Sequence, residues 1–224
     1  MAGTVSRLSL KINLVYFRIE CYYLHMAGLR ERKKRATRLA IRDAAMALFE
    51  QQGFAQTTFD RIAEAADVSR ATVFTYFPTK EEIVFGEAGA AVDALAATLA
   101  GRTAGEGTIP TVRAWLGEQT GWIEPELVLQ LRLAREVPAV GARRLRLYRD
   151  VQAVVAEALE AELGPDAHLP ARLAAAALIA AVGIAEETAA ARMEEGGEPL
   201  SAAEVDALLE DAAAFAEAGL AAVR

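Results

Sequence analysis

The sequence predicts an all-α protein of about nine helices. Three observations support this fold class. Hydrophobic residues make up 54% of the 224 residues and are supplied largely by alanine and leucine, which favour helices. The chain has only 16 glycines and 7 prolines. Its apolar residues recur at helical spacing, whereas the one alternating segment, "LSLKINLVYF", has no partner strand elsewhere in the sequence.

The first predicted helix runs from Leu29 to Gln52 and has a basic leading end, "RERKKRATR". Within it, "RERKKR" is a candidate phosphate or minor-groove arm, although a charge run on its own is more often a solvated surface. Gly53 is a natural C-terminal stop. Between these ends the apolar positions follow helical spacing: Ile41, Ala45, Leu48 and Phe49.

Two short helices follow and are joined by a tight turn. Thr57 and Thr58 are candidate N-caps for the first short helix, which carries Ile62. After the connection "ADV", Ser69 caps the second, which ends near Tyr76. Two short helices with such a turn form a helix-turn-helix.

A longer helix is expected after Pro78. Thr79 and Glu82 have the spacing of a capping box at its start. The aperiodic stretch 101–110, "GRTAGEGTIP", predicts the loop at which it ends. Along one side it carries Val84, Ala88, Val92, Leu95 and Leu99.

Five further helices are predicted, and the last opens with a capping box from Ser201 to Glu204. Alanine and glycine on the apolar stripes of the last two helices would let helix axes approach closely, which suits a bundle shared by two chains. We therefore expect a homodimer through the last two helices; the alternative is that the stripes close a core within one chain. The predicted ranges are 110–122, 126–136, 139–163, 170–194 and 202–222. The stripe expected on the last helix is Val205, Leu208, Ala212, Phe215, Gly219 and Leu220.

The first 25 residues differ in composition from the rest of the chain. They contain one alanine, three of the five tyrosines and the single cysteine, Cys21. Charged residues interrupt this stretch, which argues against a secretory signal. We expect translation to begin at Met26, and residues 1–28 to be a disordered or mis-assigned extension.

Composition excludes several classes of function. A single cysteine rules out an internal disulfide framework, and the two histidines, His25 and His168, give no metal-ligand spacing. No nucleophile, base and orienter form a recognisable motif, so we expect no enzymatic activity, cofactor or metal. No uninterrupted apolar run approaches the roughly 20 residues that span a bilayer, so a cytoplasmic protein with no membrane partner is expected.

Charge is distributed unevenly along the chain. The net charge is −7, but residues 30–80 hold ten Lys/Arg against six Asp/Glu, whereas residues 81–224 hold eleven against twenty-four. A basic end ahead of an acidic body fits a protein that contacts a polyanion with one end only. Ordinary solvated faces remain the alternative on charge alone.

The segment "GFAQTTFDRIAEAADVSRATVFTYFPTKEEIV", Gly53 to Val84, resembles the DNA-binding signature of the TetR family of transcriptional regulators. The resemblance implies a helix-turn-helix DNA-binding domain over residues 29–79 and a helical effector-binding and dimerisation domain over 80–224. Three positions depart from the usual pattern: Asp67 and Ala71 stand where glycine is common, and Phe74 where tyrosine is usual. Asp tolerates the left-handed backbone that a turn can require.

DNA-binding residues are expected on and beside the second short helix. Its N-terminus presents free N–H groups that favour phosphate. Arg70 and Thr72 are expected to read base edges, while Tyr76, Lys80 and Thr58 hold the phosphate backbone. Val73 and Phe77 should turn to the core. The full set of candidates is Thr58, Ser69, Arg70, Ala71, Thr72, Phe74, Thr75, Tyr76 and Lys80.

The resemblance further implies a repressor that a small-molecule effector releases from a palindromic DNA operator, with the helix from Lys80 acting as a lever. Candidate effector-binding residues are Trp115, Trp122, Leu131, Arg135 and Tyr148. An arginine-rich stretch, Arg143, Arg144, Arg146 and Arg149, is a candidate entrance for an anionic ligand, although a solvated helix face is the simpler interpretation. The alternative function is a DNA-binding helical protein without a small-molecule effector, controlled by a protein partner.

Overall fold

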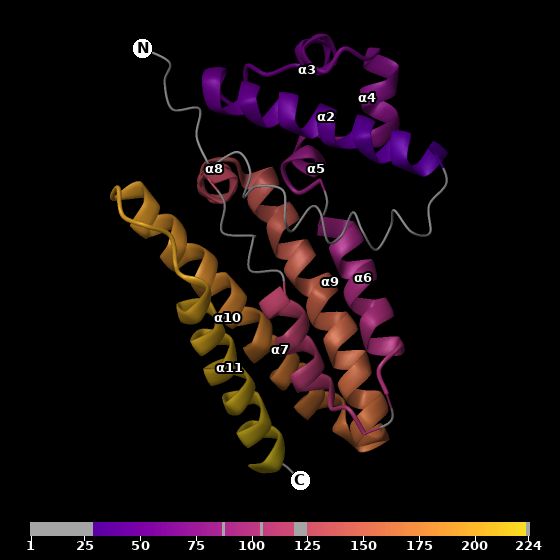
Figure 1. Ribbon diagram of the computed structural model, residues 1–224, viewed down its shortest axis with the longest axis vertical. Coiled ribbons are helices and arrows are strands. Elements are labelled where there is room, and N and C mark those ends of the chain that lie inside the picture. The colour runs from indigo at the N-terminus through magenta and orange to yellow at the C-terminus, as the bar shows by residue number, and fades with distance from the viewer. Residues whose placement is uncertain (1–28, 87, 104, 119–124, 223–224) are drawn as a thin grey trace.

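The computed structural model describes residues 29–86, 88–103, 105–118 and 125–222. Within these ranges the regular structure is entirely helical, from α2 to α11 with one short 3₁₀ turn, which confirms the predicted all-α class. Figure 1 shows α2, α3 and α4 gathered at one end, with the remaining helices extending away from them. The expectations for residues 1–28 and for Trp122 concern residues outside the described part of the chain.

The three N-terminal helices form a helix-turn-helix unit around one small core. They are α2 (Leu29–Gln52), α3 (Phe59–Ala65) and α4 (Arg70–Tyr76). The side chains of Thr58 and Ser69 cap α3 and α4 by accepting hydrogen bonds from backbone N–H groups, as the sequence predicted. The core of the unit contains the fully buried side chains Ile41, Phe49, Ile62, Val73 and Phe77.

The turn between α3 and α4 places Asp67 in the left-handed region, with φ of 52°. This confirms the expectation that aspartate tolerates a left-handed backbone at this turn. A side chain with a Cβ costs about 1–2 kcal/mol in this region, and glycine avoids that cost but gains chain entropy when unfolded.

We predict that Asp67→Ala will be about 1 kcal/mol less stable than Asp67→Gly, because alanine keeps the Cβ but lacks a side chain able to bond locally. Urea unfolding followed by circular dichroism would measure the difference. Equal stability of the two variants would contradict the strain assigned to this turn.

The helix expected to run from Lys80 to about Leu99 is divided in two, which corrects the prediction. α5 (Lys80–Val84) ends at Phe85, and α6 (Ala88–Ala100) begins after Gly86. The carbonyl of Gly86 accepts hydrogen bonds from Arg38 Nε at 3.1 Å and Nη2 at 2.7 Å. A Cβ on Gly86 would lie 3.1 Å from Cδ of Arg42 and 3.3 Å from the ring of Phe77, so a side chain there would require these neighbours to shift by a few tenths of an ångström.

The remaining helices form a bundle that follows the break between α5 and α6. α10 packs between α9 and α11, and α7 lies against α11 (Figure 1). Thr108 opens α7 as a fully buried residue, and both its N–H and its hydroxyl donate to Glu162 at 2.7 Å. The bounds are α7 (Thr108–Glu118), α8 (Pro125–Glu136), α9 (Pro138–Leu163), η2 (Pro165–Ala167), α10 (His168–Glu194) and α11 (Ala202–Ala222).

The buried stripe of α11 differs from the predicted one. Leu208 and Ala212 are only half-buried and Phe215 is 72% exposed, while Val205 and Leu220 are buried as expected. An alanine-rich helix carries two adjacent apolar stripes, and periodicity alone does not say which of them meets the neighbouring helix. The stripe that packs within the chain is Val205, Leu209, Ala213, Ala216 and Leu220.

Among the described residues, one helical stretch is long and apolar enough to cross a bilayer: Pro165–Glu194, with a mean hydropathy of 1.6. No such run was expected, because charged residues interrupt the apolar residues of this stretch. Almost half of its most apolar window, 44%, is buried inside the protein, where α10 packs against α9 and α11. Core helices of water-soluble bundles have the same composition.

Candidate DNA interface and effector cavity

The helix α4 presents a polar outer face. Arg70, Ala71 and Thr75 are exposed and Val73 and Phe77 are buried, as predicted, whereas Thr72, also predicted to face outward, is half-buried. Ser69 Oγ accepts a hydrogen bond from the N–H of Thr72 at 3.0 Å and so satisfies one of the N–H groups at the start of the helix. Free N–H groups at a helix start favour a phosphate oxygen.

Arg70 and Phe74 are held against α3 by contacts that the sequence did not reveal. Arg70 Nη1 lies 3.1 Å from Asp60 Oδ2, and its guanidinium lies 5.4 Å from the ring centre of Phe74. The Phe74 ring in turn stacks on Phe59 at 4.2 Å, so packing replaces the hydroxyl that a tyrosine would present. Because the ion pair of Arg70 is solvent-exposed, it contributes little stability and can be exchanged for a DNA contact.

Lys80 is engaged within the protein. Its ammonium donates to the carbonyls of Phe54 at 2.6 Å and Thr57 at 2.9 Å, and lies 4.4 Å from the centre of the Phe54 ring. Burial lowers the pKa of Lys80 from its ordinary value. These contacts fix the turn that leads into α3 and hence the position of Thr58, while the third ammonium hydrogen can still point to a phosphate.

Arg38 joins the end of α4 to the break after α5. Its Nη1 donates to the carbonyl of Tyr76 at 3.0 Å, while Nε and Nη2 donate to the carbonyl of Gly86. The guanidinium carbon lies 4.2 Å above the ring centre of Phe77. One side chain of α2 therefore links the end of α4 to the break between α5 and α6.

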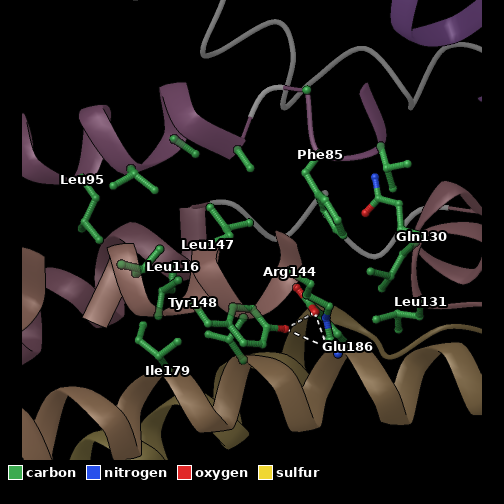
Figure 2. Close-up of a pocket in the computed structure, with 18 of the residues that line it drawn as sticks. Phe85, Leu95, Leu116, Gln130, Leu131, Arg144, Leu147, Tyr148, Ile179 and Glu186 are labelled. Carbon is green, nitrogen blue, oxygen red and sulfur yellow. Dashed lines mark hydrogen bonds and ion pairs between the residues drawn. The ribbon is translucent and has the colours of Figure 1, made fainter. Parts of the chain in front are cut away.

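A cavity of about 270 Å³ lies at the junction of the helix-turn-helix unit and the bundle (Figure 2). Its wall is mainly apolar, and it includes three of the predicted effector-binding residues: Trp115, Leu131 and Tyr148. The other lining residues are Arg42, Val84, Phe85, Gly86, Ala88, Ala91, Val92, Leu95, Leu116, Leu127, Gln130, Arg144, Leu147, Val151, Ile179, Val182 and Glu186.

Arg135, also predicted to bind the effector, is not part of this wall. Its side chain is 62% exposed and pairs with Glu194 of α10 on the surface. Arg135 lies one helical turn beyond Leu131, in the last turn of α8, where the helix has left the cavity. Helical spacing gives the face of a helix but not the depth of a pocket, so Arg135 follows Leu131 along α8 without reaching the cavity.

Three polar side chains meet on one wall of the cavity (Figure 2). Arg144 Nη2 donates to Tyr148 Oη at 2.8 Å and to Glu186 Oε2 at 3.0 Å, and the Tyr148 hydroxyl also donates to Glu186. Burial raises the pKa of Tyr148, and the nearby Glu186 carboxylate raises it further, so the hydroxyl remains a donor. Burial also raises the pKa of Glu186, although the bonds from Tyr148 and Arg144 partly oppose this.

Glu186 and Arg42 were not identified from the sequence. Glu186 interrupts the apolar run of α10, and a carboxylate in such a run is the signal that could have identified it. Arg42 belongs to α2 but is buried, lines the cavity and pairs with Glu126 of α8. Through Arg42, the helix-turn-helix unit contributes directly to the wall of the cavity.

Comparison with known proteins places these features in context. Residues 41–86 match the family described as bacterial regulatory proteins, tetR family. The HTH-type transcriptional regulator TcmR of Streptomyces glaucescens is 34% identical over 148 residues, which are 62% of this chain and 66% of TcmR. The matched region thus spans just under two thirds of that relative.

Two solved structures share the fold at lower sequence identity. The SmeT–triclosan complex has a TM-score of 0.57 and 22% identity, covering 80% of this chain and 91% of that one. The FadR repressor of Thermus thermophilus with lauroyl-CoA has a TM-score of 0.52 and 24% identity, covering 81% and 94%. The helix order therefore extends to structures in which a small molecule is bound.

Proposed function

Because this chain belongs to the TetR family of bacterial transcriptional regulators, we propose that it is a cytoplasmic repressor that a small molecule releases from a palindromic DNA operator. The observation that carries this proposal is the cavity between the helix-turn-helix unit and the bundle, whose wall includes Arg42 of α2. Members of this family regulate transcription rather than catalyse reactions, so no enzymatic activity is assigned.

In the proposed complex, residues 29–79 bind DNA and residues 80–224 bind the effector and form the dimer. The two copies of α4 enter successive major grooves, about 34–36 Å apart. Arg70 and Thr72 would read base edges and Tyr76 would hold the phosphate backbone. Ser69, Ala71, Phe74 and Thr75 would line the same contact, with Thr58 and Lys80 beside it.

The homodimer is proposed to form through α10 and α11. Both helices carry large apolar side chains that the described part of the chain leaves largely exposed: Leu173 is 60%, Ile184 55% and Phe215 72% exposed. Exposed apolar residues of this size are typical of interfaces between subunits when they share a face. Leu173 and Ile184 are eleven residues apart and so lie on one side of α10.

Release would follow from movement at the junction. An effector in the cavity contacts the Phe85–Gly86 break and Arg42, and Arg38 connects that break to the end of α4. Since α5 and α6 are separate helices, the lever is a short hinge rather than one rigid rod. The ligand must prefer the arrangement that binds DNA poorly, because only differential affinity shifts the equilibrium.

Titration of the full chain onto DNA from its own promoter, followed by candidate metabolites, tests this function. A specific shift at physiological salt that a metabolite reverses is expected. No specific shift would contradict the repressor, and a shift that no metabolite affects would favour the alternative of control by a protein partner. Triclosan and lauroyl-CoA in the two neighbouring structures support a small-molecule effector, as does the cavity itself.

Substitutions on α4 should distinguish a residue that reads base edges from a residue that holds the phosphate backbone. We predict that Thr72→Ala changes the preferred bases at one position by about 1–3 kcal/mol, while Tyr76→Phe weakens all sequences alike. Binding of a library of operator variants by each protein would measure both effects. A Thr72→Ala protein that keeps the full base preference would contradict the proposed orientation of α4 in the groove.

A further inference from the structure

The charges in the cavity wall are already paired with one another. Arg144 bonds to Glu186, and its Nη1 lies 3.4 Å from Glu187. Arg42 bonds to Glu126 and lies 3.6 Å from Asp43. Each of the two cations that line the cavity therefore has carboxylate partners, and the rest of the wall offers mainly apolar surface.

This pairing decides which ligand charge the cavity accepts. An anionic ligand would need a cation without a partner, and here it would have to displace either the half-buried Glu126 from Arg42 or the mostly buried Glu186 from Arg144. Displacing Glu186 would leave a mostly buried carboxylate without its ion pair. Burial of an unpaired charge is costly. A ligand cation would compete with Arg144 for Glu186 in the same way. A neutral ligand avoids both costs and gains from the apolar wall.

The polar cluster nevertheless provides a place for one neutral polar group. Arg144 and Tyr148 carry hydrogen-bond donors, and Glu186 carries carboxylate acceptors, on a single wall of the cavity. A hydroxyl or carbonyl can bond to such a cluster without changing its charge. The volume of about 270 Å³ is near the lower limit of ligand sites, roughly 300–1,000 Å³, and suits a compact molecule.

We propose that the effector is a compact, neutral and largely apolar molecule whose hydroxyl or carbonyl group bonds to the cluster of Arg144, Tyr148 and Glu186, and that Glu186 excludes carboxylates by pairing with Arg144. This inference rests on the proposed function for calling the occupant an effector. It also answers the sequence-level idea of an anionic entrance: Arg144 is engaged with Glu186, and Arg146 and Arg149 lie on the exposed side of α9.

The test compares three probes of one shape: 2-naphthol, 2-naphthoate and 2-methylnaphthalene, measured by equilibrium dialysis against the full chain. We expect 2-naphthol to bind at least about tenfold more tightly than 2-naphthoate, since one lost charge-assisted contact corresponds to roughly that factor. Tyr148→Phe should reduce the preference for 2-naphthol over 2-methylnaphthalene.

Glu186→Gln and Glu187→Gln form a matched pair, because each removes one carboxylate near Arg144. Glu186 is mostly buried and lines the cavity, whereas the Glu187 side chain is 67% exposed and does not. Glu186→Gln should raise the affinity for 2-naphthoate about tenfold by leaving Arg144 to the ligand, and Glu187→Gln should leave it unchanged. Thermal unfolding of each variant shows whether it folds. If Glu186→Gln does not fold, the test rests on Tyr148→Phe and its expected loss of preference for 2-naphthol over 2-methylnaphthalene.

The inference is overturned if 2-naphthoate binds the unsubstituted protein as tightly as 2-naphthol, or if the two glutamine variants respond alike. It is also overturned if no probe gives saturable binding to a preparation that binds promoter DNA. Parallel DNA titrations keep the two proposals distinct. Release of DNA by 2-naphthoate alone would contradict this inference but support an effector-controlled repressor. Tighter binding of 2-naphthol without release of DNA would support this inference but contradict the effector-controlled repressor.

Discussion

Replacing Phe77 with alanine should destabilise the helix-turn-helix unit by about 3–5 kcal/mol and abolish operator binding. Phe77 is fully buried at the end of α4, and its ring lies 4.2 Å below the guanidinium of Arg38. The truncation would leave a cavity between α2, α4 and the Gly86 break. A loss of this size is a large fraction of the total stability of a typical domain.

Phe74→Ala is the matched control for this prediction. Phe74 belongs to the same helix but is 40% exposed, and its main ring contact is with Phe59. Its truncation should cost about 1 kcal/mol, the order expected for one partly exposed aromatic pair. Urea unfolding of the two variants gives the comparison, because Phe74 is itself a proposed DNA contact and only stability separates the two sites. Equal losses of stability would show that the buried side of α4 has been assigned incorrectly.

Arg38→Leu is expected to cost roughly 2–4 kcal/mol, because the carbonyls of Tyr76 and Gly86 would each lose a donor in a partly buried site. The same change should reduce operator affinity and weaken its response to an effector, since Arg38 links α4 to the hinge. Arg38→Lys should recover only part of the stability, because a single ammonium does not reproduce the planar fork of a guanidinium.

Arg32→Leu provides the comparison for charge. Arg32 lies on the same helix but is exposed, so its replacement should change stability by less than about 0.5 kcal/mol. Thermal or urea unfolding distinguishes the two sites. If Arg38→Leu and Arg32→Leu unfold alike, Arg38 does not hold the junction together.

The helix-turn-helix unit was predictable almost residue by residue because its signals are local. Thr58, Ser69 and Thr79 cap helices through their own side chains, and a cap specifies a helix start without knowledge of the rest of the fold. The left-handed turn at Asp67 is local in the same sense. The described helices of the bundle also agree closely with the predicted ranges, since their breaks contain glycine and proline.

Features that depend on distant contacts were not predictable. The expected long helix is divided at Gly86, whose carbonyl accepts hydrogen bonds from Arg38, a residue far away in sequence. The buried stripe of α11 differs from the predicted one because its packing against α7 and α10 determines which face is buried. In the cavity, Trp115, Leu131 and Tyr148 were among the predicted residues, whereas the other apolar lining residues were not. The ion pair of Arg144 with Glu186 was also not predictable, because it joins two helices. Sequence periodicity gives the face of a helix, whereas the depth and charge balance of a pocket require the packed structure.

Reciprocal coupling between DNA and effector tests the central claim most directly. The measurement is the operator affinity of the full chain with and without a saturating effector identified by DNA release, together with the effector affinity with and without operator. We predict that both affinities fall by the same factor, about five- to 150-fold, because linkage requires equal coupling in the two directions. An effector that binds the operator-bound and free protein equally would contradict control of DNA binding through this cavity.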